Sequence, residues 1–330
     1  MKSELEGELE ALDAAEVHLE DGQFAVRELA RWPGHYVGRT HDGAPSILLS
    51  SKDHGVKAPL RLSGLDVNYS LPCRLRLGDG PSVDKMLTTV RCSSVDPGVR
   101  RYFVHLMEAL LVSVGVMPSL AQIADAMHSI VAILQHLSST ARKSVAGCFG
   151  ELMVIEMSAD AAAAIGAWRD ATDDQFDFSM GEARLDVKAS GNRSRMHHFS
   201  FGQCSLPPER LGVLVSLFVE SCGGGTTMLQ LVQRIEQKIS GYPNLALKLR
   251  RVLAETLGRD APSALIAEFD ERLARSSVRL YNLAHIPAVR PPIPVGVDQV
   301  QFRSDVSQTA TAPREALIDT CPLLELLLPP

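Results

Sequence analysis

Two aspartates and a lysine stand in segments that otherwise have the pattern of core strands. Asp177 lies between two phenylalanines, and Asp186 lies between a leucine and a valine. Lys188 follows two residues later, so a strand places it on the same face as Asp186. A carboxylate on the buried side of a sheet is costly unless it is paired or binds a metal. Two such carboxylates on adjacent strands predict a site for a hard divalent ion, Mg²⁺ or Mn²⁺.

Such a site can hydrolyse a phosphodiester bond. The ion would polarise the scissile phosphate and lower the pKa of a bound water, while Lys188 would position that water or stabilise developing negative charge. Glu151, on a preceding apolar helix, would supply another ligand or orient a metal-bound water. In the alternative interpretation, Asp177 caps a turn, and Asp186 and Lys188 are solvent-facing residues of an edge strand.

A basic cluster follows the second aspartate. It contains Arg193, Arg195, His197 and His198, and it is a candidate for a loop that contacts phosphates. A solvated loop explains the same residues. Gln203, a little further on, is a candidate for contact with a base edge or with the nucleic-acid backbone near the metal. Its alternative is an ordinary hydrogen bond from the side chain to the protein backbone.

The elements that must position these residues can be predicted from the pattern. Turn residues at 180–182 separate two short alternating runs, so the strands that carry Asp177 and Asp186 are predicted to fold back on each other. Residues 211–219 form a nearly continuous apolar run, which predicts a strand buried on both faces in a sheet covered by helices.

The helix that carries Glu151 is predicted over residues 141–158, with a cap from the polar cluster Ser138-Ser139-Thr140. On a helical wheel Glu156 falls nearer the apolar stripe of this helix than Glu151 does. Glu156 is therefore the alternative ligand on this helix.

The rest of the chain divides by character. Residues 1 to about 25 are acidic with apolar residues at helical spacing, and residues 30–92 contain short β-type runs with turn signals. Asp96-Pro97 is a typical start for a helix. Further helices and a late strand are predicted from periodicity at 97–114, 119–138, 229–257 with a break at 241–243, 262–275 and 300–303.

The composition is that of a globular protein and does not indicate nucleic-acid binding by the chain as a whole. The 330 residues are 45% hydrophobic and 22% charged, with a net charge of -6. Any contact with DNA must then be a local basic patch. The six cysteines have no metal-ligand spacing, which predicts reduced thiols. Without a signal peptide pattern or a membrane span, a cytoplasmic location is expected.

These residues together resemble a known family. The helix with Gly150-Glu151, then Phe176-Asp177, then Asp186-Val187-Lys188-Ala189-Ser190 resembles the PD-(D/E)XK phosphodiesterase superfamily, which has the restriction-endonuclease-like fold. With the Trp168 segment and the run from Ser200 to Gln203, the chain is similar to PD-(D/E)XK motif proteins of bacterial anti-phage defence clusters. Phe176 stands where the superfamily name has proline, a common departure that affects no ligand.

The resemblance implies an α/β (α+β) core with a central mixed sheet flanked by helices. It also implies catalytic roles for Asp177, Asp186, Lys188 and Glu151, with Mg²⁺ or Mn²⁺ held by the three carboxylates. The implied division is a β-rich N-terminal domain at 1–95, a helical connector at 96–140, the nuclease-like core at 141–228 and a helical C-terminal region with a Pro-rich tail at 229–330.

The expected function is metal-dependent DNA cleavage, as the nuclease subunit of a restriction or defence system. Further subunits of such a system, including a methyltransferase and an ATPase, are the expected partners besides DNA, and a homo-oligomer is the other assembly considered. The alternative is a catalytically inactive subunit that keeps the fold for DNA binding or assembly.

Overall fold

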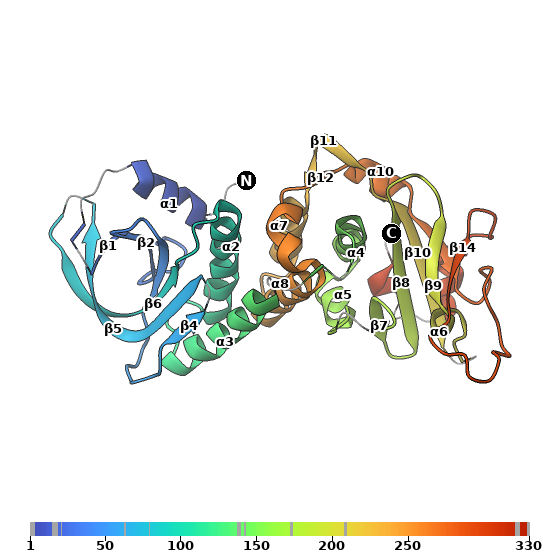
Figure 1. The fold of residues 1–330 in the computed structure, drawn as a ribbon, viewed down its shortest axis with the longest axis horizontal. Helices are drawn as coiled ribbons and strands as arrows, with labels where there is room; N and C mark the ends of the chain where they lie inside the picture. The colour runs from blue at the N-terminus through green and yellow to red at the C-terminus, as the bar shows by residue number, and fades with distance from the viewer. Residues whose placement is uncertain are drawn as a thin grey trace. The chain divides into compact units, whose positions relative to one another are not determined.

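The chain forms two compact units, Met1–Leu134 and Gln135–Pro330, which are described separately (Figure 1). The computed structural model describes residues 4–14, 19–20, 22–62, 64–78, 80–136, 140–141, 143–171, 174–207, 210–320 and 324–328.

The first unit is built on a sheet that closes on itself. Its strands are β1 (Gln23–Glu28), β2 (Tyr36–Thr40), β3 (Pro45–Leu49), β4 (Leu60–Leu62), β5 (Leu65–Leu77) and β6 (Val83–Cys92). They follow the order β1-β2-β3-β6-β5-β4, and β1 also pairs in parallel with β5, which closes five strands into a ring. Alternating side chains of these strands, among them Val26, Leu48 and Leu75, fill its core.

Three helices belong largely to this unit: α1 (Glu4–Ala14), α2 (Pro97–Val114) and α3 (Leu120–His136). The Asp96 carboxylate caps α2 by accepting hydrogen bonds from the amides of Gly98 and Val99, at 2.7 and 3.1 Å, as predicted. The segment expected to be a separate connector is tied to the β-rich part instead, since the Leu120 amide donates to Asp53 at 2.7 Å. Most of residues 96–140 therefore lies within the first unit.

The second unit contains the predicted mixed sheet. Its strands are β7 (Phe178–Met180), β8 (Ala183–Ser190), β10 (Leu211–Phe218) and β13 (Arg279–Asn282), in the order β13-β10-β8-β7. β10 runs parallel to β8, while β13 and β7 are antiparallel to their neighbours. The predicted β7–β8 hairpin and the buried strand β10 are confirmed, and so is the α/β class. β13 was not predicted, and it extends the sheet beyond the expected core boundary at residue 228.

The sheet is covered on both faces (Figure 1). The remaining helices are α4 (Val145–Met157), α5 (Ala161–Ala167), α6 (Phe201–Cys204), α7 (Met228–Lys238), α8 (Pro243–Leu257), the 3-10 helix η1 (Gly258–Asp260), α9 (Ala261–Ala264), α10 (Glu271–Ser276), α11 (Arg314–Thr320) and α12 (Leu324–Leu327). Two further strand pairs are β9 (Met196–Ser200) with β14 (Gln301–Asp305), and β11 (Ser221–Thr227) with β12 (Glu268–Phe269). α4 packs on one face, against β8.

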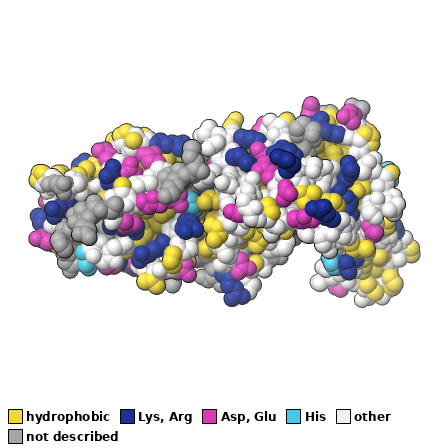
Figure 2. Space-filling view, turned by 90° about the horizontal axis from the view of Figure 1, so that it is seen from above, with side chains coloured by type: hydrophobic (Ala, Val, Ile, Leu, Met, Phe, Trp, Pro, Cys, Tyr) yellow, Lys and Arg dark blue, Asp and Glu magenta, His cyan; other side chains and the backbone are white. Residues whose placement is uncertain are grey.

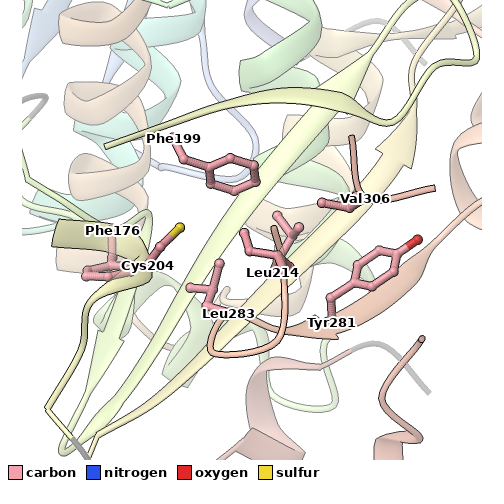
Figure 3. Close-up of a cluster of buried hydrophobic side chains, with 8 residues drawn as sticks. Phe176, Phe199, Cys204, Leu214, Tyr281, Leu283 and Val306 are labelled. Atoms are coloured by element: carbon pink, nitrogen blue, oxygen red, sulfur yellow. The ribbon is translucent and has the colours of Figure 1, made fainter. Parts of the chain in front are cut away.

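The opposite face carries an apolar cluster that joins the sheet to β9 and to the segment after β14 (Figure 3). Phe199 of β9 and Val306 lie over Leu214 of β10 and Tyr281 of β13, and all four are buried. This cluster fixes β9 and the short helix α6 over the face from which Asp186 and Lys188 project.

Two predicted helices differ from the structure. The helix that carries Glu151 begins at Val145 rather than 141, because Ser144 caps it by accepting from the Gly147 amide at 3.0 Å. Of the three predicted caps, Ser138 and Ser139 lie outside the described residues. The helix predicted at 262–275 is two short helices separated by β12, and Asp270 caps the second.

Two further predictions concern single residue types. The described cysteines, Cys73, Cys92, Cys148, Cys204 and Cys222, are free thiols, and Cys321 lies outside the described residues. In the described parts of the chain, no helix has the length and apolar character that crossing a bilayer requires.

Candidate active site

The close approach of α4 to β8 places Glu151 beside the aspartates. A Cβ atom on Gly150 would lie 3.0 Å from the Ala189 Cβ and 3.6 Å from a Val187 methyl carbon, so any larger residue there would push α4 and β8 apart by a few tenths of an ångström. Val187 and Ala189 therefore face α4, and the intervening Asp186 and Lys188 face the other side of the sheet.

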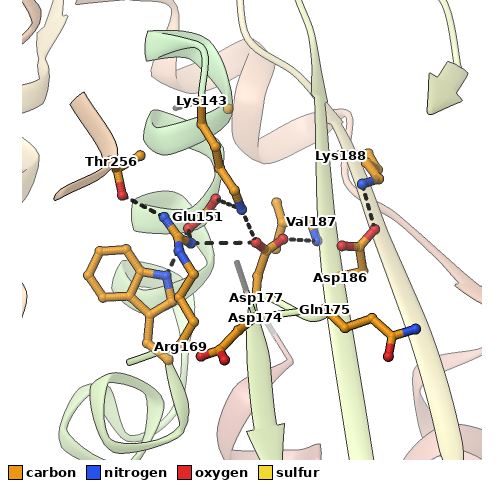
Figure 4. A network of polar contacts seen from close by, with 12 residues as sticks. Lys143, Glu151, Arg169, Asp174, Gln175, Asp177, Asp186, Val187, Lys188 and Thr256 are labelled. Atoms are coloured by element: carbon orange, nitrogen blue, oxygen red, sulfur yellow. Dashed lines mark hydrogen bonds and ion pairs between the residues drawn. The ribbon is translucent and has the colours of Figure 1, made fainter. Parts of the chain in front are cut away.

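Asp177 stands between these two sides. It comes directly before β7, and its Oδ2 accepts a hydrogen bond from the Val187 amide at 2.8 Å. Figure 4 shows Asp177 between the Glu151 group and the Asp186–Lys188 pair. The three sequence-predicted acids and Lys188 thus lie in one neighbourhood.

On the α4 side, two cations hold Glu151 and Asp177 together. Lys143 Nζ lies 3.0 Å from Glu151 Oε1 and also donates to Asp177 Oδ1. Arg169 donates to Glu151 Oε2 and lies 3.5 Å from Asp177 Oδ1. The Trp168 indole N–H adds a third donor to Glu151, at 2.8 Å from Oε2. Two buried carboxylates and two cations make this network electrically balanced.

Arg169 is fixed from outside the network as well. Its second terminal nitrogen donates to Thr256 Oγ1 at 2.7 Å, near the C-terminal end of α8. Its guanidinium also lies 5.3 Å from the centre of the Trp168 ring. Arg169 is buried, so the arginine is part of the core of this unit.

On the other side, Asp186 has a sparser set of partners. Its Oδ1 accepts from Gln203 Nε2 at 2.9 Å, and its Oδ2 lies 3.0 Å from Lys188 Nζ. That oxygen is buried but accepts no hydrogen bond of normal geometry from any residue that the structure describes. Gln203 also donates to the Gln175 carbonyl at 2.9 Å and closes a capping box with Ser200, which fixes its side chain.

The two aspartates have opposite pKa shifts. Burial disfavours the charged form of Asp177, but the charges of Lys143 and Arg169 outweigh it and hold the pKa of Asp177 below its usual value. Burial raises the pKa of Asp186 to about 6, against the opposing charge of Lys188. Burial likewise opposes the charge on Lys188, yet Asp186 and Asp177 raise its pKa. A pair of carboxyls with divergent pKa values is typical of catalytic sites.

The two aspartates suit a divalent ion that takes only part of its ligands from the protein. Among the described residues, no group of three or more His, Cys, Asp or Glu side chains converges as metal ligands. Mg²⁺, however, needs only one or two carboxylates when water and phosphate oxygens complete its shell. The buried Asp186 Oδ2 and the Asp177 carboxylate, which lies directly before the adjacent strand β7, could supply these two ligands.

Glu156, the alternative helix ligand, lies elsewhere. It pairs with Lys238 at 3.3 Å and with Arg275 at 2.7 Å, near the C-terminal end of α4. The prediction of Glu156 from the helical wheel was wrong because every described residue from Cys148 to Met157 except Glu156 is buried, so the apolar stripe does not single out one face.

The four predicted nucleic-acid contacts have different environments. Arg193 is exposed and forms a bidentate pair with Glu220, at 2.7 and 3.0 Å. Arg195 donates to the carbonyl and the hydroxyl of Ser216, at 2.8 and 2.7 Å, and so braces β10. Gln203 is buried against Asp186, and His198 is exposed on β9, paired across the strands with Arg303.

The surface shown in Figure 2 is mixed in charge. On the face shown in Figure 2, Lys and Arg side chains lie among Asp and Glu side chains. Of the four candidates, Arg193 and His198 have side chains exposed to solvent, whereas Arg195 and Gln203 are engaged in internal hydrogen bonds. Contact with nucleic acid remains a prediction for all four.

Sequence analysis missed Lys143, Arg169 and Thr256. Arg169 directly follows Trp168, which belongs to the recognised pattern, so that position offered a signal. Lys143 precedes the capping serine of α4 and was assigned to the helix. Thr256 lies 87 residues from Arg169 in the chain, and its role becomes visible only in the folded structure.

Comparison with known protein families identifies a relationship for this chain. A family model described as "Putative PD-(D/E)XK family member, (DUF4420)" matches residues 10–307, which cover most of each unit and all the site residues named above. No curated protein and no solved structure matches significantly. Since the family model covers most of the chain, the protein belongs to the DUF4420 family, whose description is that of a "putative PD-(D/E)XK family member".

Proposed function

We propose that this protein is a metal-dependent endonuclease that hydrolyses DNA phosphodiester bonds. The observation that carries the proposal is the pairing on β8: the Asp186 carboxylate and the Lys188 ammonium project from one face, 3.0 Å apart, and Asp177 is bonded to the backbone between them. Membership of a PD-(D/E)XK family supports the same chemistry.

Each residue of the site has a separate role in the proposed reaction. Asp177 and Asp186 would hold Mg²⁺ or Mn²⁺, which when bound would supply Lewis-acid polarisation of the scissile phosphate. Lys188 stands beside Asp186 with its ammonium charged, so it stabilises negative charge that develops on the phosphate. Gln203 orients Asp186 through its 2.9 Å hydrogen bond. Glu151 is held by three donors and acts by positioning Asp177 through their shared cations.

Plasmid cleavage with Mg²⁺ or Mn²⁺ tests the proposal. The wild type is expected to nick or linearise DNA, EDTA to stop it, and Asp186→Asn and Lys188→Met each to lower the rate by about 10²-fold or more. Glu182→Gln is the matched control, because this turn residue pairs with Arg210 at 3.2 Å at the surface. If the aspartate and lysine variants cut as fast as the wild type, the catalytic assignment is wrong.

The second candidate is a non-catalytic subunit for DNA binding or assembly. The balanced network favours it in one respect, since Lys143 and Arg169 already neutralise Glu151 and Asp177 without a metal. Such a subunit would neither cut DNA nor bind Mn²⁺.

We further propose that the protein acts in a restriction or anti-phage defence system, with a methyltransferase and an ATPase as partners. The net charge of -6 supports recruitment to DNA by other subunits. Co-purification with the products of neighbouring genes, followed by cleavage assays on the complex, tests this role. Activity that needs the complex supports it, and a wild type fully active alone argues against it.

A further inference from the structure

Lys143 occupies the position where a cation would be shared by Glu151 and Asp177. Its Nζ is 3.0 Å from Glu151 Oε1 and donates to Asp177 Oδ1, so one ammonium joins carboxylates from α4 and from the segment before β7. Asp177 Oδ2 accepts from the Val187 amide, so an ion bound by Asp177 would use Oδ1, and it cannot occupy the position that the Lys143 ammonium already holds against that oxygen.

Only one of the two cations in the network is able to leave. The Lys143 side chain is 31% exposed, whereas that of Arg169 is 0% exposed. Arg169 is held by Thr256 and lies over the Trp168 ring. The Lys143 backbone amide is bonded to the Thr256 carbonyl at 3.4 Å, so its main chain is anchored while the flexible side chain reaches solvent.

We propose that Lys143 is a displaceable counterion: it keeps the Glu151–Asp177 pair assembled in the ion-free protein and gives way when a divalent cation binds. Its departure would free Asp177 Oδ1, the oxygen that is not bonded to the Val187 amide, together with Glu151 Oε1. Arg169 and the Val187 amide stay in place and preserve the geometry. This inference rests on the proposed metal-dependent function and adds a residue that controls metal occupancy.

Mn²⁺ binding, measured by the EPR signal of the free ion, tests this proposal without reference to activity. Lys143→Met removes the competing charge and is expected to tighten the dissociation constant by about tenfold. Lys143→Arg replaces it with a charge that pairs bidentately with carboxylates, and is expected to weaken binding. Lys238→Met is the matched control, because Lys238 pairs with Glu156 of the same helix at 3.3 Å and should leave the constant unchanged.

A second readout is the fluorescence of Trp168, whose indole is bonded to Glu151 at 2.8 Å. In a Trp32→Phe background, Trp168 is the remaining tryptophan of the two in the chain, so Mn²⁺ should alter its emission at lower concentrations in Lys143→Met. Should Lys143→Met fail to fold, the weaker binding expected for Lys143→Arg still decides the matter.

The outcomes separate the two proposals. If the wild type binds Mn²⁺ and Asp186→Asn abolishes binding, but Lys143→Met binds equally or more weakly, Lys143 is a structural anchor and the displacement is refuted. If no variant nor the wild type binds Mn²⁺, the metal-dependent function fails, and the inference about Lys143 fails with it.

Discussion

The carboxylates on the two sides of β8 differ in their partners and in the direction of their pKa shifts. On the α4 side, Asp177 has two cations and a backbone amide as partners, and its pKa is lowered. On the β9 side, Asp186 has one lysine and one glutamine, keeps an oxygen without a hydrogen bond, and has its pKa raised to about 6. The carboxylates of the first side are balanced by Lys143 and Arg169, whereas on the second side Asp186 Oδ2 lies 3.0 Å from the Lys188 ammonium and accepts no hydrogen bond of normal geometry from the described residues.

The largest effect is expected from breaking the balanced side at Arg169. Arg169→Met removes a buried cation and leaves Glu151 and Asp177 short of positive charge, so we expect a loss of about 3–5 kcal/mol in the free energy of unfolding. Urea unfolding measures it. The double variant Glu151→Gln with Arg169→Met should recover part of the loss, and a loss below about 1 kcal/mol would show that Lys143 alone supports the network.

Whether a contact of the site could be predicted from the sequence depends on how far apart its two residues lie in the chain. The pairing of Asp177 with the β8 strand could be predicted, because the turn at Gly181 and the alternating runs are local signals. The partners of Glu151 could not, since Lys143 and Arg169 reach it through tertiary packing and Arg169 is in turn held by Thr256 of α8. Helical periodicity fails at α4 because the helix is buried almost all round.

The fold shows the same limit. The buried strand β10 was predicted from its apolar run, whereas β13, its antiparallel neighbour, was missed because four residues containing Arg279 and Asn282 carry no strand pattern. Likewise, β12 consists of two residues and exists through its pairing with β11. Edge strands of this kind are defined by their partners rather than by their own sequence.

The next largest effect is expected from replacing each aspartate by asparagine in metal-free buffer, where the two changes in the free energy of unfolding should have opposite signs. The lowered pKa of Asp177 contributes stability that is present above the unfolded pKa and is lost as the pH falls, so Asp177→Asn should destabilise the protein at pH 8 by about 2–4 kcal/mol. The raised pKa of Asp186 has the opposite effect on the pH dependence. The contribution of this carboxyl to the stability of the protein is greatest at low pH and declines as the pH rises from about 4 to about 6.

Asp186→Asn removes that decline and should stabilise the protein at pH 8 by about 1–2 kcal/mol, with the difference disappearing near pH 4. The gain is smaller than the pKa shift alone would give, because the Lys188 ammonium loses its charged partner. Urea unfolding of both variants at several pH values gives the comparison. Two variants that lose stability equally at pH 8 would mean that both carboxylates are structural, and the contrast between the sides of β8 would be wrong.

The smallest effect is expected at Gln203, which supplies the only hydrogen bond that Asp186 accepts from the described residues, at 2.9 Å. Gln203→Met removes this donor to the charged form, so the pKa of Asp186 should rise further above about 6. Loss of the capping box should cost about 1 kcal/mol in the free energy of unfolding. The carboxyl carbon chemical shift of Asp186, followed by NMR across pH, measures the change directly.

Ser200→Ala is the control, because it weakens the same cap but leaves the Gln203 amide able to reach Asp186. A rise in pKa with Gln203→Met and none with Ser200→Ala assigns Gln203 to the positioning of Asp186, whereas equal shifts would assign the effect to α6 as a whole.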